Sequence, residues 1–570
     1  MAVRKSCDAI MMKYFLKLRN NIALEGDTIL AKREVCHLFE NVEDVYLDNI
    51  NIIPCYVPKA QRLSYIRGNG LIGFVATYPK VSLGKLAHLL SFIQEIWSEN
   101  EGEEIPAYSR RVEDAICTIP LMAMSEILSF SGKPDKTTID EIVDALSGER
   151  FSSKTAIKGI LRVNTSSPHI HSFHKYKAKF FPRFVRSLIV SSIDLNKSTV
   201  TVCDPYVGSG TTLIESSLLG YDSFGFDIDP LSCFISEIKS AALNTTFADL
   251  ETIKDTIHTH NSNLTFVFPY EIQKKFRRWD TLDEMNEYQQ EISNELNLIE
   301  KKAGFAKQLN QIALSDALTR KFNIRMVGTG SGRFALEIAK TSLSNLIQTD
   351  IKSSLEALKT IEVIKDVYNI STPAPRVCMG NATMRNCQDE TCDIIITSPP
   401  YLPASSGREN YLIGKMISLK ALGLLDNKDQ ILKNSVGSMV CQNDSDLNDL
   451  PKSVADLYNW LINDELRQIK AAPIVAYYHS IKKSLEEDKR TIKGDGKIIY
   501  IIGKESVFYN NSTKEILYKV ECDNIFIEIA KSVGLSVDEV VSIELDKKNA
   551  VARPRSSDKY YETAVILSKN

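Results

Sequence analysis

The segment Ser398-Pro399-Pro400-Tyr401 combines residue types that could do chemistry on an amine. It follows the run 393–396, which is rich in β-branched isoleucine and therefore favours a strand. Two consecutive prolines fix φ and stiffen the backbone, so the carbonyls around Ser398 and Pro399 would project from the strand end with little freedom. A fixed hydroxyl and a fixed carbonyl could accept both N–H bonds of an exocyclic amine and stabilise the positive charge that develops on its nitrogen.

The amine of a nucleobase is an acceptor group that needs such help. Its lone pair is delocalised into the ring, which makes the nitrogen a poor nucleophile, and Tyr401 could stack on the face of the same ring. With a good electrophile, alignment supplies much of the remaining barrier reduction, and neither a metal nor a covalent intermediate is required. A base inside a duplex cannot reach such a segment, so the base would have to be flipped out.

A second segment has the residue types of a nucleoside-binding loop. The loop Asp204–Thr212 follows a predicted strand, Thr199–Cys203, and opens a predicted helix, Thr211–Leu219. Gly208 and Gly210 lack Cβ atoms, so the backbone could turn tightly and approach a ligand closely. The loop matches neither the dinucleotide pattern GxGxxG nor a P-loop, and its small size suits a carboxylate or an amino-acid moiety better than a triphosphate.

An acidic residue ends the next predicted strand, Ser223–Ile228. The carboxylate of Asp227 could accept both ribose hydroxyls of a nucleoside, and Asp229 is the neighbouring alternative. Strand, glycine loop, helix and second strand form the opening of a doubly wound sheet. A further glycine-rich run, 328–332, lies in a helical stretch with no clear strand before it, and is interpreted as a flexible loop.

Together, the two segments resemble the amino-methyltransferase family of DNA modification enzymes. The patterns Asp-Pro-Tyr-x-Gly-Ser-Gly-Thr-Thr and Thr-Ser-Pro-Pro-Tyr carry the resemblance. We call the four residues Ser398-Pro399-Pro400-Tyr401 the tetrad. A tetrad that begins with Ser is typical of the cytosine-N4 branch, whereas the tetrad of adenine-N6 enzymes more often begins with Asp. The resemblance implies S-adenosyl-L-methionine (SAM) as cofactor and methyl transfer to N4 of cytosine in DNA. It also implies a restriction-modification or defence context, with a cognate restriction endonuclease as partner.

The resemblance assigns roles to individual residues. The stretch Phe173–Arg183 is similar to the family's cofactor-side motif, and 380–382, Gly-Asn-Ala, is similar to the segment that contacts adenine. Asn381 stands where many relatives have Asp, and Tyr206 stands where Phe is usual. The catalytic residues implied are Ser398, Pro399, Pro400 and Tyr401, and the cofactor-binding residues implied are Phe173, Lys179, Asp204, Tyr206, Gly208, Gly210, Thr211, Thr212, Asp227 and Asn381.

The elements around these residues, together with the resemblance, predict an α/β protein. It would have a Rossmann-like class I SAM-dependent methyltransferase sheet of seven strands, a helical insertion and a mainly helical N-terminal region. A capping box at Thr138 and a helix over 153–161 give a helix-turn-helix outline that could read DNA. Helices are predicted over 82–98, 282–305, 334–346, 454–487 and 524–533, and further strands over 377–379, 393–397, 497–502 and 562–567.

Four regions follow from this order of elements. Residues 1–160 form an accessory region that could bind DNA, and residues 161–240 form the first part of the methyltransferase domain, with the cofactor loop. Residues 241–375 form the helical insertion, a candidate for target recognition. Residues 376–570 form the second part of the methyltransferase domain, with the tetrad and the C-terminal strands.

Composition and charge are those of an ordinary globular protein. The apolar fraction is 44%, the charged fraction is 25%, and the net charge of −3 does not itself indicate nucleic-acid binding. The N-terminal residues lack the apolar core of a signal peptide, and no apolar run reaches the ~20 residues of a membrane span, so a cytoplasmic protein is expected. His169 and His171 have no Cys or carboxylate partner at ligand spacing in the sequence, so no metal site is expected.

Two other functions stay open. An RNA base amino-methyltransferase would share the fold and often has an appended RNA-binding domain, but such enzymes often carry Asn or Asp in place of Ser398. A non-catalytic subunit of a restriction system could keep the fold to bind SAM or nucleic acid without turnover. Both the glycine loop with Asp227 and the tetrad are intact, which argues against a dead site.

Overall fold

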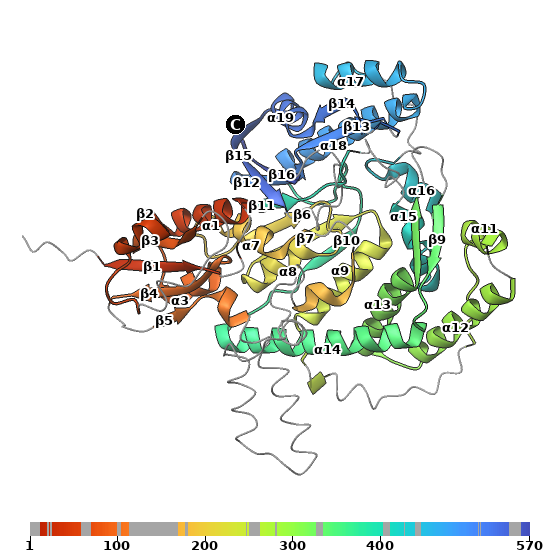
Figure 1. Ribbon diagram of the computed structural model, residues 1–570, viewed down its shortest axis with the longest axis horizontal. Coiled ribbons are helices and arrows are strands. Elements are labelled where there is room, and N and C mark those ends of the chain that lie inside the picture. The colour runs from red at the N-terminus through yellow and green to blue at the C-terminus, as the bar shows by residue number, and fades with distance from the viewer. Residues whose placement is uncertain are drawn as a thin grey trace, which may run out of the picture. The chain divides into compact units, whose positions relative to one another are not determined.

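The computed structural model (Figure 1) divides into two compact units. Unit 1 comprises residues 1–165 and 186–197, and unit 2 comprises residues 166–185 and 198–570. The structure describes residues 12–19, 22, 25–58, 70–99, 104–112, 169–176, 180–246, 248–249, 263–279, 282–326, 334–402, 411–426, 428–438, 446–510, 512–513, 515–545 and 560–570.

Unit 1 is built on an antiparallel five-stranded sheet with the order β2-β3-β1-β4-β5. Strand β3 has every residue from Leu71 to Thr77 buried, so its side chains are covered on both faces of the sheet. The described elements are β1 (Lys13–Leu18), α1 (Glu25–Leu38), β2 (Phe39–Tyr46), η1 (Leu47–Ile52), β3 (Leu71–Pro79), α3 (Leu83–Leu89), β4 (Ile93–Ser98) and β5 (Glu104–Pro106), with α7 (Pro182–Val190) shared between the units.

This sheet corrects the expectation of a mainly helical N-terminal region. The helix predicted over 82–98 ends at Leu89, and the strand β4 begins at Ile93. The apolar spacing of Ile93, Ile96 and Trp97 fits a helix, but these residues are β-branched or aromatic, and β4 pairs with β1. Such pairing joins residues far apart in the sequence, so local periodicity cannot reveal it. The predicted helix-turn-helix outline, 138–161, lies outside the described residues.

Unit 2 contains a seven-stranded sheet with the order β10-β7-β6-β11-β12-β16-β15 (Figure 1). The first five strands are parallel, and β16 runs antiparallel to both of its neighbours. The sequence analysis did not predict β15, because charged residues interrupt the apolar residues of this strand. The strands are β6 (Thr201–Asp204), β7 (Asp222–Asp227), β10 (Arg376–Met379), β11 (Cys392–Thr397), β12 (Ile492–Gly503), β15 (Leu535–Leu545) and β16 (Tyr560–Lys569).

The order of these strands reverses between β6 and β11. From β6 the chain builds the sheet outward through β7 and β10, and it then returns to the other side of β6 to begin β11 and β12. In doubly wound sheets, ligands bind beyond the carboxyl ends of the strands at such a switch point. The carboxyl ends of β6 and β11 are Asp204 and Thr397, so the glycine loop and the tetrad leave the sheet side by side.

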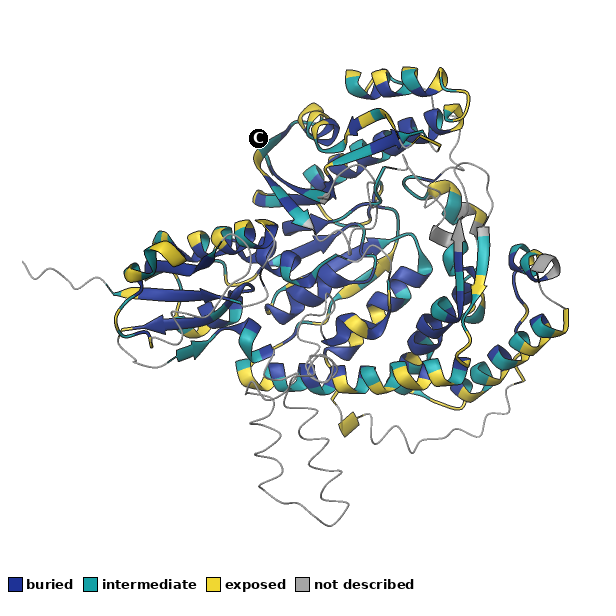
Figure 2. Cartoon of the chain, in the orientation of Figure 1, coloured by how far each residue is buried: buried dark blue, intermediate teal, exposed yellow. Residues whose placement is uncertain are grey.

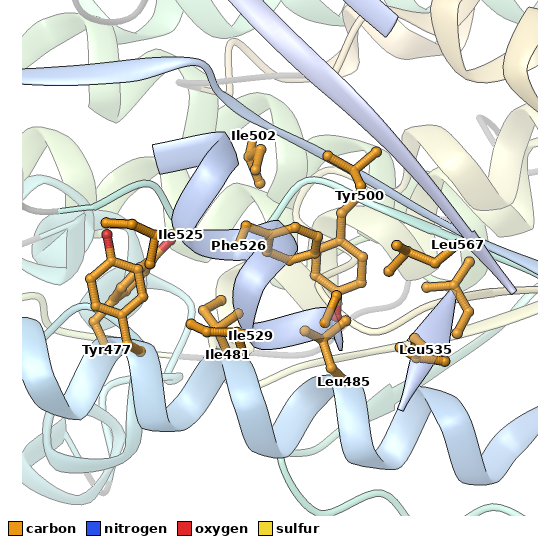
Figure 3. Packing of buried hydrophobic residues seen from close by; sticks show 14 of the residues in the cluster. Tyr477, Ile481, Leu485, Tyr500, Ile502, Ile525, Phe526, Ile529, Leu535 and Leu567 are labelled. Carbon is orange, nitrogen blue, oxygen red and sulfur yellow. The ribbon is translucent and has the colours of Figure 1, made fainter. Parts of the chain in front are cut away.

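Helices α18 and α19 pack on one face of this sheet, as Figure 3 shows, and α17 packs against α18. Tyr477, Ile481 and Leu485 of α18 meet Phe526 and Ile529 of α19 over the strands. Each such side chain contributes about 1.5–3 kcal/mol to the free energy of unfolding when it is fully buried. The helices are α17 (Lys452–Ile462), η3 (Gln468–Lys470), α18 (Ala471–Thr491) and α19 (Cys522–Ser532), and the short strands β13 (Glu505–Tyr509) and β14 (Ile516–Glu521) pair beside them.

Helices α8 and α9 contact the strands β6, β7 and β10, as expected for crossover helices between parallel strands. Figure 2 shows the burial pattern that follows, with buried residues along the strands and exposed residues on the outer faces of helices. In the described part of the chain, none of the helices has the length and apolarity needed to cross a bilayer. The elements at the start of unit 2 are η2 (His169–Phe173), α8 (Thr211–Leu218) and α9 (Pro230–Ala242).

The segment between β7 and β10 has a core of its own, built around Phe268, Phe276 and Phe322. It differs from prediction at 334–346, where Phe334–Ile338 form a strand paired with β8, and the helix begins only at Leu343. Ser342 caps that helix by accepting a hydrogen bond from the Asn345 amide. The elements are α11 (Tyr270–Trp279), α12 (Leu282–Glu300), α13 (Gly304–Lys321), β8 (Phe322–Met326), β9 (Phe334–Ile338) and α14 (Leu343–Tyr368), and α15 (Tyr411–Ala421) and α16 (Lys428–Asn434) follow β11.

A buried ion pair lies beneath the sheet. The Arg385 guanidinium donates to Asp488 Oδ1 at 2.6 Å, and neither side chain is exposed to solvent. The Tyr500 hydroxyl donates to the other carboxylate oxygen at 2.6 Å. Removal of one partner would leave the other charge buried and unpaired, which is far more costly than removal of an exposed pair.

We therefore expect Arg385→Met to lower the free energy of unfolding by about 3–5 kcal/mol, measured by urea denaturation of the full chain. Asp389→Asn is the matched control, since Asp389 is 71% exposed in its ion pair with Arg490, and it should cost at most about 1 kcal/mol. Equal effects of the two substitutions would contradict this assignment.

Candidate active site

The tetrad begins where β11 ends. Thr397 is the last residue of the strand, and Ser398-Pro399-Pro400-Tyr401 continues beyond it without regular structure. Pro399 is buried, whereas Ser398, Pro400 and Tyr401 are half-buried. The segment is therefore held by the sheet at one end and partly exposed at the other.

A hydrogen bond joins the tetrad strand to the glycine loop. Thr397 Oγ1 donates to Asp204 Oδ1 at 2.6 Å, and the Tyr206 amide donates to the same oxygen at 3.0 Å. Asp204 is the last residue of β6, which pairs with β11. Burial raises the pKa of Asp204 to about 6, and the hydrogen bond from Thr397 opposes this rise. Asp204 thus connects the two predicted segments, and the sequence did not predict that contact.

The glycine loop folds back on the end of β7. Gly208 has φ of 52° and its amide donates to Asp227 Oδ2 at 2.8 Å, while the Val207 amide donates to the Phe226 carbonyl at 2.9 Å. This approach requires Gly225, because a Cβ there would lie 2.3 Å from Val207 Cγ2. Loop and strand end therefore form one unit, with Asp227 between them.

Asp227 is a half-buried carboxylate at the end of β7. Its two oxygens accept the amides of Gly208 and Asp229, at 2.8 and 2.9 Å. Burial and the neighbouring Asp229 raise the pKa of Asp227 to about 6. Each carboxylate oxygen has a second lone pair, so Asp227 can still accept hydroxyl groups from a ligand.

The residues present fit a nucleoside with an amino-acid tail. A Cβ at Gly208 would have Tyr176 Cε1, at 3.7 Å, as its nearest neighbour, so the loop leaves space for close approach of a ligand. The carboxylate of Asp227 could accept ribose hydroxyls. These residues could hold SAM, and a triphosphate would find no Lys after the second glycine.

The remaining predicted cofactor residues occupy different environments. Asn381 is half-buried just beyond β10, whose last residue, Met379, pairs with Asp227, so Asn381 lies at the same edge of the sheet. Its Oδ1 accepts the Thr383 amide and hydroxyl, both at 3.0 Å. Phe173, Tyr206, Gly210, Thr211 and Thr212 are largely enclosed by protein around the loop, and Lys179 lies outside the described residues.

Two further residues at the site were not predicted. The Tyr401 hydroxyl donates to Glu562 Oε1 at 2.5 Å, so the last strand, β16, fixes the tetrad tyrosine. Burial raises the pKa of Glu562 to about 7. Lys415, on α15, forms an ion pair with Asp229 beside the glycine loop. Neither residue belongs to a sequence pattern, and only the fold brings them to the site.

His169 and His171 gain a carboxylate partner that sequence spacing did not show. His171 Nε2 lies 2.8 Å from Glu215 Oε1 of α8, and all three residues are buried, with their ligand atoms within 4.8 Å of one another. The hydrogen bond between His171 and Glu215 ties the segment that precedes the glycine loop to the helix that follows it.

Comparison with known proteins gives the class. The type II methyltransferase M.MvaI of Kocuria varians is 22% identical over 391 residues, which cover 64% of this chain and 83% of that protein. The type II methyltransferase M.BsoBI of Geobacillus stearothermophilus is 24% identical over 435 residues, which cover 67% of this chain and 81% of that protein. The chain is thus a distant homologue of type II methyltransferases, on an α/β fold.

No family model matches the chain. Among solved structures, a SAM-dependent methyltransferase from Methanosarcina mazei is 8% identical and covers 65% of this chain and 93% of its own, with a TM-score of 0.23. That likeness is too slight to carry an argument.

The contact between the tetrad strand and the loop gives a prediction. Thr397→Val removes a hydrogen bond to a buried carboxylate and should lower the free energy of unfolding by about 1–3 kcal/mol. Because the pKa of Asp204 in the folded state exceeds its ordinary value, stability falls as pH rises through about 6. Without the Thr397 hydroxyl, the pKa of Asp204 in the folded state should be higher still, so the loss of stability with rising pH should extend to higher pH in Thr397→Val.

The matched control is Thr391→Val, since the Thr391 hydroxyl makes only an exposed hydrogen bond to the Gln388 carbonyl. Urea denaturation from pH 4 to 8 measures both variants. If Thr397→Val were as stable as the control at every pH, the proposed importance of this contact would be wrong.

Proposed function

We propose that the protein is a site-specific DNA methyltransferase that transfers a methyl group from SAM to the exocyclic N4 of cytosine. The observation that carries the proposal is the hydrogen bond between Thr397 and Asp204, because it joins the strand end that precedes the tetrad to the strand end that precedes the glycine loop. Numbered along the chain, the strands of the large sheet have the order 3-2-1-4-5-7-6 with one reversed strand, which supports a class I methyltransferase fold.

Three residues of the tetrad have a part in the reaction. Bound SAM supplies an electrophilic methyl group. Ser398 Oγ and the Pro399 carbonyl accept the two N–H bonds of the target amine, which favours a tetrahedral nitrogen and stabilises its developing positive charge. Tyr401, held by Glu562, stacks on the flipped base. After transfer, the nitrogen loses a proton through the Ser398 hydroxyl, which is half-buried and can pass it to water.

The residues of the loop hold and align the cofactor. The glycines of the loop let its backbone approach the amino-acid end closely, Asp227 accepts the ribose hydroxyls, and Asn381, at the same edge of the sheet, contacts adenine. Alignment of the methyl group with the amine then supplies much of the catalysis.

The choice of DNA and of cytosine rests on two supports. M.MvaI and M.BsoBI are type II methyltransferases, and homology with them favours a DNA substrate and a cognate restriction endonuclease as partner. Ser398 favours N4 of cytosine over N6 of adenine, because the tetrad of the cytosine-N4 branch begins with Ser.

One observation favours a second candidate, an RNA base amino-methyltransferase. Unit 1 is a separate compact unit with its own antiparallel sheet, as an appended RNA-binding domain would be. Incubation of the full chain with SAM and either DNA or RNA, followed by mass analysis of the nucleosides, separates the candidates. N4-methylcytosine in DNA supports the proposal, methylated RNA alone supports the second candidate, and SAM binding with neither product supports a non-catalytic subunit.

The tetrad gives a prediction for activity. Ser398→Ala should reduce kcat by about 100-fold or more, because one of two fixed acceptors is lost, as when a single group is removed from an oxyanion hole. The affinity for SAM, measured by calorimetry, should not change. Ser453→Ala, at an exposed hydrogen bond with Glu528, is the control and should keep full activity. Full activity of Ser398→Ala would refute the assignment of the tetrad.

Asp227 gives a prediction for the cofactor. Asp227→Ala should weaken SAM binding by about 10–100-fold, because hydrogen bonds to a charged acceptor are lost. A protonated carboxyl is a poorer acceptor, and the pKa of Asp227 is about 6. The affinity of the unaltered protein for SAM should therefore fall as pH decreases through about 6 and be constant above pH 7. Titration calorimetry at several pH values checks this, and an affinity independent of pH between 5 and 8 would argue against Asp227 as the ribose acceptor.

A further inference from the structure

Lys415 lies in a cluster of polar groups beside the cofactor loop. Its ammonium forms an ion pair with Asp229 and donates to the Tyr176 hydroxyl at 3.2 Å, and it lies 4.5 Å from the centre of the Tyr176 ring. The side chains of Lys415 and Asp229 are only 17% and 16% exposed. The ion pair is therefore largely shielded from water, where it is stronger than an exposed pair.

The cluster joins three segments of unit 2. Asp229 caps α9 by accepting the Leu231 amide at 2.9 Å, and the hydroxyls of Tyr176 and Ser232 lie 2.8 Å apart. Lys415 belongs to α15, which is the next described element after the tetrad. The cluster thus connects the segment before the glycine loop, the helix after β7 and the helix that follows the tetrad.

The cluster also adjoins Asp227. The Asp229 amide donates to Asp227 Oδ1, and the Tyr176 ring is the nearest neighbour of a Cβ placed at Gly208. Two carboxylates so close repel each other, and Lys415 supplies the compensating charge. Burial favours the neutral form of Asp229, but Lys415, together with the hydrogen bonds from Leu231 and Ser232, lowers the pKa of Asp229. Asp229 therefore stays charged and paired.

We propose that Lys415 is a positioning residue of the cofactor site: it neutralises Asp229, so that Asp227 alone receives the ribose hydroxyls, and it holds Tyr176 beside Gly208. This inference rests on the proposed SAM-dependent function. It assigns to α15 a direct link between the tetrad side and the cofactor side of the site.

The charge of Lys415 should be visible in the pH dependence of SAM binding. Lys415 lowers the pKa of Asp227, against the effects of burial and Asp229. The other titratable groups that face Asp227 are Tyr176, Tyr206 and Cys233, whose pKa values are all raised by burial, so they stay neutral near pH 7. Loss of the ammonium should therefore move the midpoint of SAM binding upward in pH.

The test compares Lys415→Met, Lys415→Arg and Lys420→Met with the unaltered full chain. Lys420 is an exposed lysine on the same helix, so its replacement is the matched control. SAM affinity is measured by calorimetry from pH 5 to 8. We expect Lys415→Met to raise the midpoint by about one pH unit, which weakens binding about twofold at pH 7 and about tenfold at pH 5, where one pKa unit corresponds to a tenfold change. Lys415→Arg should largely restore both values, and Lys420→Met should change neither.

A second variant separates positioning from a general loss of structure. Lys415→Met leaves Asp229 charged and unpaired, whereas the double variant Lys415→Met/Asp229→Asn removes both charges and keeps the acceptor that caps α9. The double variant should bind SAM with a midpoint no higher than that of the unaltered protein. A midpoint still raised in the double variant, or unchanged in a folded Lys415→Met, would overturn the inference. Absence of SAM binding in the unaltered protein would instead refute the proposed function.

Discussion

The site depends on the reversal of strand order between β6 and β11, where a single hydrogen bond joins the two strand ends. Thr397 donates to Asp204 in a buried environment, where an unpaired carboxylate is costly. The tetrad and the glycine loop each follow directly from one of these residues. Their relative position is therefore fixed by the sheet. This rigidity suits a reaction in which alignment accounts for much of the barrier reduction.

The same edge of the sheet gathers three carboxylates, Asp204, Asp227 and Asp229, and each is stabilised in a different way. Asp204 accepts a hydroxyl and an amide, Asp227 accepts two amides, and Asp229 pairs with Lys415. Only Asp229 has a cation as a direct partner, which explains why its pKa is lowered while those of the other two are raised. The environment thus distinguishes carboxylates that the sequence presents as alike, and it leaves Asp227 available to a neutral hydroxyl donor.

Prediction from the sequence was most accurate where local signals agree with the fold. The strands β6, β7, β11, β12 and β16 and the helices α8, α12 and α19 were located within a few residues, because apolar runs, glycine turns and caps mark them. The sequence prediction was wrong at 93–98 and 334–338, where it gave helices and the structure has strands. Short amphipathic segments fit the periodicity of either a helix or a strand, and pairing with another strand decides which of the two forms. The prediction also merged α17 and α18 into one helix over 454–487, although 463–470 break the helical run.

For the site, the sequence by itself determined the two segments and the chemistry that we propose for them. Two prolines after a strand, and glycines before a helix, restrict the backbone wherever they occur, so Ser398 to Tyr401 and the loop from Asp204 to Thr212 were legible as local patterns. Only the tertiary structure decided that Thr397 meets Asp204, that Glu562 holds Tyr401, and that Lys415 pairs with Asp229. Each of these contacts joins residues more than a hundred positions apart, and such proximity arises from sheet order and helix packing, which no local pattern encodes.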